Sequence, residues 1–218
     1  MRHIASFRHF LSTGVLGPLS LGMDLASVAR MIGPPQAFGA LGSDDPLPLC
    51  WRYENEGSLL EIDFLRTPPH SVERLRLDPS LRGEFCLFGP NLLMTTDGIV
   101  GGAPPSAFLR GGAVDAAAAM VHLTETLDVT IVFQHVRIRF EGGEDFAESL
   151  DMESKQAIFA DFGAALDFTE IDRCLGAADF LAGSDTACPE RVVTRASCST
   201  QTYLAMLATS ETPTDDRS

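Results

Sequence analysis

The side chains that most often carry chemistry are scattered along this chain. None of the histidines stands in an HxH or HxxxH pairing, so we predict no metal site. The cysteines are odd in number and form no CxxC pair, a usage typical of a reducing compartment rather than a disulfide framework. The residues in question are His3, His9, His70, His122 and His135, and Cys50, Cys86, Cys174, Cys188 and Cys198.

No nucleophilic site is predicted from a local motif. A reactive cysteine needs a base beside it, and Cys50 and Cys86, which lie among apolar residues, are interpreted as inert core thiols. A G-x-S-x-G sequence is absent, and the nearest approach is the stretch around Ser184. We therefore predict no catalytic residue. An enzyme whose site combines distant residues, such as His122 or His135 with a cysteine, remains an alternative.

The glycines near the start of the chain do not predict a nucleotide site. A phosphate loop needs G-x-x-x-x-G-K-[ST] and a dinucleotide loop needs G-x-G-x-x-G, because backbone amides must converge on the phosphates. Gly14, Gly17 and Gly22 fit neither spacing, and no lysine follows them. A calcium loop of the form D-x-[DN]-x-[DN]-G is also absent. We expect no cofactor and no bound metal.

The charge of the chain is acidic and unevenly distributed. Its 218 residues carry a formal net charge of -14, which argues against nucleic acid as a ligand because phosphate binding needs a basic face. Residues 141–190 contain 13 acidic residues against Lys155 and Arg173, a surplus of 11. This region is either a solvated face that maintains solubility or an acidic patch that attracts a basic partner.

The acidic region supplies the candidate partner-binding residues. Complementary charge raises association rates and rejects wrong partners, so a protein with a basic surface is the expected ligand of such a patch. The candidates are Glu141, Glu144, Asp145, Glu148, Asp151 and Glu153.

The first residues do not match the pattern of a signal peptide. Arg2 and Arg8 precede a mildly apolar stretch, but Gly14, Gly17 and Pro18 interrupt it and no A-x-A cleavage site follows. No run reaches the 18 or so apolar residues of a membrane span. We expect a cytoplasmic chain without a membrane partner.

A helix and three strands are predicted in the first third of the chain. Asp24 is a suitable N-cap for a helix over residues 25–32, whose apolar face is Leu25, Val28, Ala29 and Ile32, and Gly33 with Pro34 and Pro35 ends it. The alternation of apolar and polar residues predicts strands over residues 50–53, 58–65 and 71–78. Trp51, Tyr53 and Phe38 are interpreted as core aromatics, with an interface anchor as the alternative.

This order of elements resembles a known family. Gly22-Met23, Val28, IGPP at residues 32–35, WRY at 51–53 and LEIDF at 60–64 are similar to the repeat of the SmpA/OmlA and beta-lactamase-inhibitor-like superfamily. The resemblance covers residues 16–77 and implies a short helix packed on an antiparallel sheet. It also extends to immunity proteins of bacterial toxin systems. The chain departs from the lipoprotein members because it has no lipobox cysteine.

The rest of the chain is expected to be a second α+β unit. Residues 86–112 are rich in glycine and proline and predict a connection between a unit at 1–85 and one at 113–208. In the second unit we predict helices over 113–123, 156–166 and 169–183, strands near 127–141 and 190–197, and a disordered tail at 209–218. VRIRF at 136–140 is similar to LEIDF, so a diverged second copy is one interpretation.

The predicted fold class is α+β, with short helices packed on an antiparallel sheet. Three functions remain open. The leading expectation is a non-enzymatic protein-binding protein, most concretely a bacterial immunity protein that occludes a cognate toxin. The alternatives are a small-ligand-binding or regulatory module and the enzyme described above.

Overall fold

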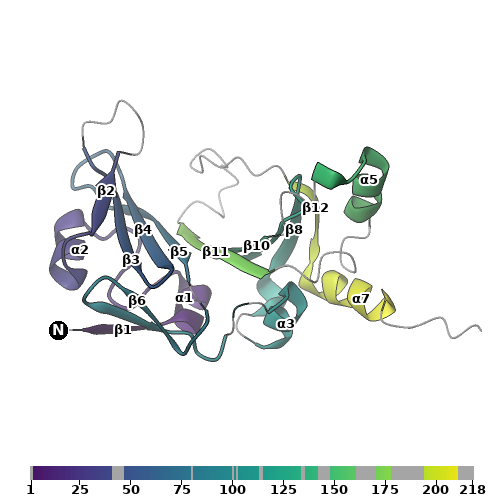
Figure 1. The fold of residues 1–218 in the computed structure, drawn as a ribbon, viewed down its shortest axis with the longest axis horizontal. Helices are drawn as coiled ribbons and strands as arrows, with labels where there is room; N and C mark the ends of the chain where they lie inside the picture. Colours follow the sequence, from purple (N-terminus) through teal and green to yellow (C-terminus); the bar gives the residue numbers. More distant parts are fainter. Residues whose placement is uncertain are drawn as a thin grey trace, which may run out of the picture.

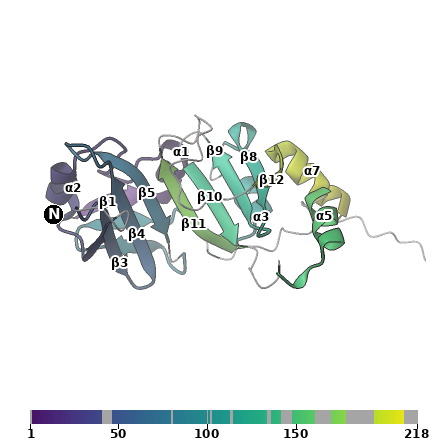
Figure 2. The same ribbon diagram turned by 90° about the horizontal axis from the view of Figure 1, so that it is seen from above.

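The fold is α+β and is built around a nine-stranded, antiparallel sheet. A computed structural model describes residues 2–40, 47–79, 81–99, 101, 103–112, 115–133, 136–141, 148–160, 170–177 and 194–210. The large sheet has the strand order β12 (Thr194–Ser199), β8 (Met120–Thr124), β9 (Val129–Phe133), β10 (Val136–Glu141), β11 (Glu170–Ala177), β5 (Val72–Asp78), β4 (Ser58–Phe64), β3 (Cys50–Asn55) and β2 (Ala37–Gly39). A second sheet has the order β1 (His3–Ser6), β7 (Leu92–Thr95) and β6 (Phe85–Phe88). The large sheet extends along the whole length of the molecule, with helices at both ends (Figures 1 and 2).

The predicted helix is present as α2 (Leu25–Ile32). The Asp24 side chain accepts a hydrogen bond from the Ser27 backbone amide at its start, and Gly33 ends it with a φ of 89°. Val28 and Ile32 are fully buried. The helix therefore lies on the sheet through the apolar face that the sequence indicates.

The three predicted strands are β3 (Cys50–Asn55), β4 (Ser58–Phe64) and β5 (Val72–Asp78), and they form a continuous antiparallel meander. Gly57 gives the β3–β4 turn a positive φ of 81°, which glycine adopts readily. One sheet face carries the buried Leu60, Ile62 and Phe64. The other face carries charged residues, as the period-two pattern predicts.

The three-stranded sheet was not predicted from the sequence. It consists of β1 (His3–Ser6), β6 (Phe85–Phe88) and β7 (Leu92–Thr95), where β1 pairs with β7 in parallel. Helix α1 (Phe7–Thr13) follows β1 directly and buries Phe7, Phe10 and Leu11. Paired residues such as His3 and Leu92, 89 positions apart in sequence, thus lie in one layer of the core, and local periodicity does not reveal such a pairing.

Much of the segment expected to be a connection is regular structure. Residues 86–112 contain most of the β6–β7 hairpin and helix α3 (Pro105–Arg110), whose Phe108 packs edge-on against Phe140 at a centroid distance of 5.8 Å. The buried apolar residues of both halves belong to one cluster. The division of the chain into units at residues 85 and 113 stays a prediction.

The predicted helix over residues 113–123 is wrong. Its alanines form only a short 3-10 turn, η1 (Ala116–Ala118), and the chain then enters β8 (Met120–Thr124). β8 pairs with β9 (Val129–Phe133), which pairs with β10 (Val136–Glu141). Burial of Val121 and Leu123 in the sheet outweighs the helix propensity of alanine. His122 consequently lies on a strand, not on a helix.

The predicted helix from residue 169 is also wrong. Residues 170–177 form β11 (Glu170–Ala177), which pairs with β10 on one side and β5 on the other. Because β11 joins the two halves of the sheet, its conformation depends on strands far away in the sequence. On its two sides lie two similar four-strand antiparallel arrangements.

The C-terminal region closes one end of the sheet. Helix α5 (Met152–Ala160) overlaps the helix expected over residues 156–166, and β12 (Thr194–Ser199) overlaps the expected last strand. Helix α7 (Thr200–Ser210) was not predicted, and it buries Tyr203 and Leu207. The expected disordered tail begins inside α7, and its residues after 210 lie outside the described part of the chain.

Candidate binding surfaces

The structure places only part of the predicted acidic patch. Glu144 and Asp145 lie outside the described residues, and Glu141 ends β10 with a side chain that is likewise not described. Glu148, Asp151 and Glu153 are exposed, and they lie before and at the start of α5. Three of the six predicted residues are thus brought together at one end of the molecule.

These exposed acids differ in the local hydrogen bonds that they form. Asp151 is the N-cap of α5, because its Oδ1 accepts a hydrogen bond from the Ser154 backbone amide at 2.7 Å. Hydrogen bonds from Ser154 hold the pKa of Asp151 below its usual value. Within the described part of the chain, no cation forms an ion pair with Glu148, Asp151 or Glu153. Their negative charge therefore faces solvent.

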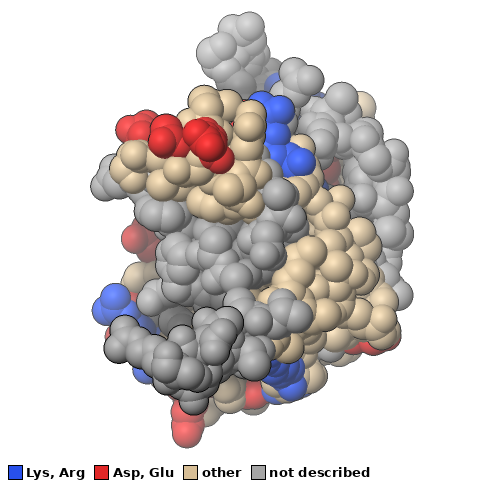
Figure 3. Space-filling view, turned by 90° about the vertical axis from the view of Figure 1, so that its right-hand side faces the viewer, with Lys and Arg blue, Asp and Glu red and all other residues tan. Residues whose placement is uncertain are grey.

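Figure 3 shows this end of the molecule in space-filling form. Aspartate and glutamate side chains gather near its top, where α5 lies, with a few lysine and arginine atoms beside them. Below them the middle of the described surface is uncharged, and single acidic and basic side chains lie toward its lower and left edges. The largest group of acidic side chains on this face thus lies at its top.

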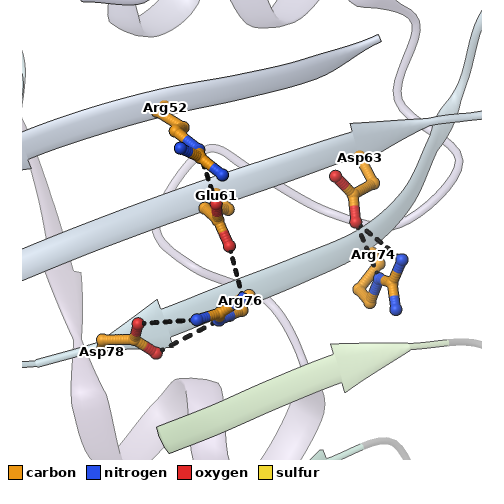
Figure 4. A network of polar contacts seen from close by, with 6 residues as sticks. All are labelled: Arg52, Glu61, Asp63, Arg74, Arg76 and Asp78. Atoms are coloured by element: carbon orange, nitrogen blue, oxygen red, sulfur yellow. Dashed lines mark hydrogen bonds and ion pairs between the residues drawn. The ribbon is translucent and has the colours of Figure 1, made fainter. Parts of the chain in front are cut away.

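A second charged surface lies on the outer face of β3, β4 and β5, and its acids are paired (Figure 4). Glu61 bridges two strands, because its Oε1 lies 2.7 Å from Arg52 Nε and its Oε2 lies 2.8 Å from Arg76 Nη1. Arg76 Nη2 in turn lies 3.1 Å from Asp78. A separate pair joins Arg74 to Asp63 at 2.8 Å.

The register of the strands explains these pairs. Arg52 lies opposite Glu61, Glu61 opposite Arg76, and Asp63 opposite Arg74, and cross-strand neighbours on one face are close enough for ion pairing. The Glu61 side chain is only 8% exposed, whereas that of Arg52 is 56% exposed. The Glu61 carboxylate raises the pKa of Arg52 above its ordinary value. This network fixes the sheet and leaves little net charge for a partner.

The second half of the sheet contains a smaller buried cluster. Asp128 pairs with Arg139 Nη2 at 2.9 Å and accepts a hydrogen bond from the Thr126 hydroxyl at 2.6 Å. The Asp128 backbone amide donates to the Thr124 hydroxyl at 3.1 Å. These contacts hold the turn between β8 and β9, and sequence analysis did not single out any of the four residues.

Cys50, Cys86 and Cys198 form no disulfide bond, and their environments oppose ionisation. Burial, with a smaller contribution from the Asp63 charge, raises the pKa of Cys50 to about 12. Burial also raises the pKa of Cys86 and of Cys198. Since the thiolate is the nucleophilic form, a raised pKa opposes reaction at all three. Cys86 is buried in the core, as predicted, whereas Cys50 is only partly buried.

The alternative site, in which His122 or His135 combines with a cysteine, does not form between His122 and Cys198. On β12, Ser197 lies opposite His122 and Cys198 lies opposite Val121. Adjacent strand residues point to opposite faces, so Cys198 and His122 lie on opposite sides of the sheet. His135, Cys188 and Ser184 lie outside the described residues. Among those that are described, no cluster of three potential metal ligands occurs.

A cavity of about 440 Å³ lies at the open end of the β6–β7 hairpin. Its walls come from residues 81–85 and 95–99 and are mainly apolar, with Glu84 and Asp97 among the polar groups. Partial burial opposes ionisation of Asp97, but hydrogen bonds from Ser6, Thr95 and the Arg8 amide outweigh it and lower the pKa of the carboxyl. This cavity was not predicted from the sequence because the β6–β7 hairpin that forms it was expected to be a connection.

The aromatic residues divide between the core and the surface. Trp51 and Tyr53 are buried on one face of β3, as predicted, and the Tyr53 hydroxyl donates to the Gly33 carbonyl at 2.8 Å. Phe38 instead lies on β2 (Ala37–Gly39) and is 67% exposed. The interpretation of Phe38 as a core residue is wrong, because β2 is the last strand of the sheet and nothing described covers it.

Comparison of the chain with protein-family models, curated proteins and solved structures finds no match. The resemblance of residues 16–77 to the SmpA/OmlA and beta-lactamase-inhibitor-like superfamily therefore stays a prediction. Its structural implication, a short helix on an antiparallel sheet, agrees with the packing of α2.

No helix in the described part of the chain is long and apolar enough to cross a membrane.

Proposed function

We propose that this chain is a non-enzymatic protein-binding protein whose acidic end, around α5, binds a partner with a basic surface. The observation that carries the proposal is the contrast between paired and unpaired acids. Glu61, Asp63 and Asp78 are paired with arginines on the sheet. Glu148 and Glu153 are exposed at α5, and no described cation pairs with them.

The physical argument is one of electrostatic steering. A chain with a net charge of -14 repels acidic molecules and attracts basic ones, and an unpaired cluster concentrates that attraction at one place. The most concrete form of this proposal is an immunity protein that occludes a cognate toxin. It rests on the resemblance of residues 16–77 and on the acidic surplus. Cys50, Cys86 and Cys198 form no disulfide bond, a usage typical of proteins in a reducing compartment.

The test is charge reversal at the two exposed glutamates that do not cap the helix. The tagged chain is purified from its own host, and affinity for the recovered partner is then measured by titration. The Glu148→Lys/Glu153→Lys variant should bind at least about tenfold more weakly at low salt, with a weaker dependence on ionic strength.

The matched control reverses two exposed acids elsewhere, Glu54→Lys/Glu56→Lys. This variant has the same net charge but keeps the acidic end, and its affinity should stay much closer to that of the unchanged chain. Equal affinity of both variants and the unchanged chain at low salt would remove the acidic-end mechanism.

A second candidate function is small-ligand binding, and the cavity beside β6 and β7 favours it. Its volume of about 440 Å³ lies within the usual range of ligand pockets, and apolar walls with a few polar groups are typical of them. A thermal-shift screen against metabolites would identify a ligand. The Phe85→Lys variant should abolish the shift, and Met152→Lys on α5 should preserve it. A shift that survives in the Phe85 variant would place the ligand elsewhere.

A further inference from the structure

The cavity at the open end of the β6–β7 hairpin, called the β6–β7 cavity below, has buried apolar residues in its wall. Leu81 and Ile99 both line it and are 4% and 8% exposed. The two loops that form the wall are joined by hydrogen bonds. The Thr96 amide donates to the Glu84 carbonyl at 3.0 Å, and the Thr96 hydroxyl donates to the Gly83 carbonyl at 3.1 Å. The fold therefore holds the wall of the cavity in place.

An exposed aromatic ring and a carboxylate share one side of this cavity. Phe85 is 55% exposed, and it lies opposite Thr95 in the hairpin, so the two side chains lie on the same face of the sheet. The Thr95 hydroxyl donates to Asp97 Oδ1 at 2.7 Å, which keeps the Asp97 carboxylate near that face. A carboxylate near the face of an aromatic ring favours an organic cation, since both attract positive charge.

The charge of Asp97 remains available to a ligand. Its hydrogen-bond donors are neutral groups: within the described residues, the Ser6 hydroxyl and the Arg8 amide donate to Oδ2, and the Thr95 hydroxyl donates to Oδ1. A carboxylate oxygen can accept two hydrogen bonds, so Oδ1 retains one acceptor position. The Arg8 guanidinium is engaged elsewhere, because it donates to the Gly112 carbonyl at 2.6 Å and to the Asp97 carbonyl at 3.4 Å.

Acidic side chains outnumber basic ones in the wall of the cavity. Glu84 and Asp97 are the acids, and Arg82 is the one base. Glu84 and Arg82 are exposed, and neither forms an ion pair with another described residue. The net charge of -14 on the whole chain also concentrates cations at its surface. Local and overall charge therefore both favour a cationic ligand over an anionic one.

We propose that the β6–β7 cavity binds a small organic cation in which an ammonium group is attached to an apolar body. The ammonium group donates a charge-assisted hydrogen bond to Asp97 Oδ1 and lies against the Phe85 ring. The apolar body packs against Leu81 and Ile99, and Glu84 adds negative charge beside it. This inference rests on small-ligand binding at the cavity, the second candidate function described above.

Three probes that share a phenylethyl body separate the effect of charge from that of shape. They are 2-phenylethylamine, 2-phenylethanol and 3-phenylpropionate. Each is titrated to about 10 mM into the full chain labelled with nitrogen-15, and the amide chemical shifts report both the site and the dissociation constant. The amine should shift the amides of residues 81–85 and 95–99, and it should bind at least about tenfold more tightly than the alcohol or the acid. Added salt should weaken its binding.

Charge-neutralising variants test the two carboxylates. Asp97→Asn should weaken binding of the amine at least about tenfold, and Glu84→Gln at least about threefold, because each removes negative charge from the cavity. Glu54→Gln is the matched control, since it makes the same change of charge at an exposed acid outside the cavity. It should leave the affinity unchanged. Circular dichroism checks that all three variants remain folded.

Two results would overturn the inference in different ways. Equal affinity for the amine and the acid, with both lost in Phe85→Lys, would show a ligand site without a preference for cations. If none of the probes shifted the amides of residues 81–85 and 95–99, small-ligand binding at the cavity would fail together with the inference.

Discussion

The outer face of β3–β5 and the acidic end at α5 use the same residue types to opposite effect. On the sheet, Glu61 contacts Arg52 and Arg76 through separate oxygens, and it is almost fully buried. At α5, Glu148 and Glu153 are exposed and have no described cation beside them. A count of charges therefore does not locate a binding surface. A charge is available to another molecule only where the fold does not pair it with an opposite charge.

The largest effect on stability is expected for Glu61→Ala, because Glu61 is the acid that pairs with two arginines on the sheet. Removal of the carboxylate leaves Arg76 partly buried without this partner, while the exposed Arg52 regains water. We expect a loss of about 2–3 kcal/mol in the free energy of unfolding, below the full penalty for a buried pair. Urea denaturation measures it.

The control for that variant is Glu54→Ala, on the neighbouring strand β3 and exposed. A change within about 0.5 kcal/mol is expected there. If the Glu61 and Glu54 variants lost the same stability, the ion-pair network would contribute nothing beyond an ordinary surface charge.

An intermediate effect is expected at Asp97, which is exposed but bonded to Ser6, Thr95 and the Arg8 amide. Its folded pKa is lowered below the unfolded value of 3.8, so its stabilising contribution is present above that pH and is lost as pH falls through the folded pKa. The Asp97→Asn variant should therefore be less stable than the unchanged chain at pH 7, by less than about 1 kcal/mol because solvent screens the group.

The measurement is the melting temperature of both proteins between pH 2 and 7. This range includes the usual carboxyl pKa of about 4. The difference between the variant and the unchanged chain should shrink as the solution becomes more acidic. A difference that is constant with pH would assign the effect of Asp97 to packing rather than to its charge.

The smallest effect on stability is expected at the acidic end. Glu148→Gln/Glu153→Gln should change the free energy of unfolding by no more than about 0.5 kcal/mol, because neither side chain has a described ionic partner to lose. Thermal denaturation measures it. A loss as large as that of the Glu61 variant would mean that these glutamates support the fold, and the comparison between the two regions would fail.

The elements that were predicted correctly are those whose signals are local. Asp24, the apolar spacing of Val28 and Ile32, and Gly33 all act within one helix, so α2 is read directly from its sequence. The alternation in β4 and β5 is equally local. It also places charged residues on one face, although it does not say that Glu61 meets two arginines.

The incorrect predictions concern segments whose conformation depends on distant neighbours. The alanines after residue 115 favour a helix, but β8 follows them because Val121 and Leu123 are buried between β9 and β12. β11 was predicted to be helical and is a strand because it hydrogen-bonds to β5 and β10 on both sides. Propensity is a weak signal, and tertiary pairing outweighs it in both segments.

The candidate sites show the same division. The acidic surplus of residues 141–190 was evident from the sequence, and the structure places Glu148, Asp151 and Glu153 at an exposed end. The cavity beside β6 was not predicted because the β6–β7 hairpin was not predicted. The Asp128 cluster and the exposure of Phe38 depend on how strands pair in the sheet, which local periodicity does not show.

Four features could be predicted from the sequence: the α+β class, the helix at residues 25–32, the meander of β3 to β5 and the acidic character of the chain. These follow from periodicity, capping and composition, which are properties of neighbouring residues. Tertiary structure alone decided which carboxylates are neutralised, which aromatic side chain is exposed, and that β11 joins both halves into one sheet. The reason is physical: burial and strand pairing depend on residues far apart in the chain, and their free energies exceed the local preferences that a sequence displays.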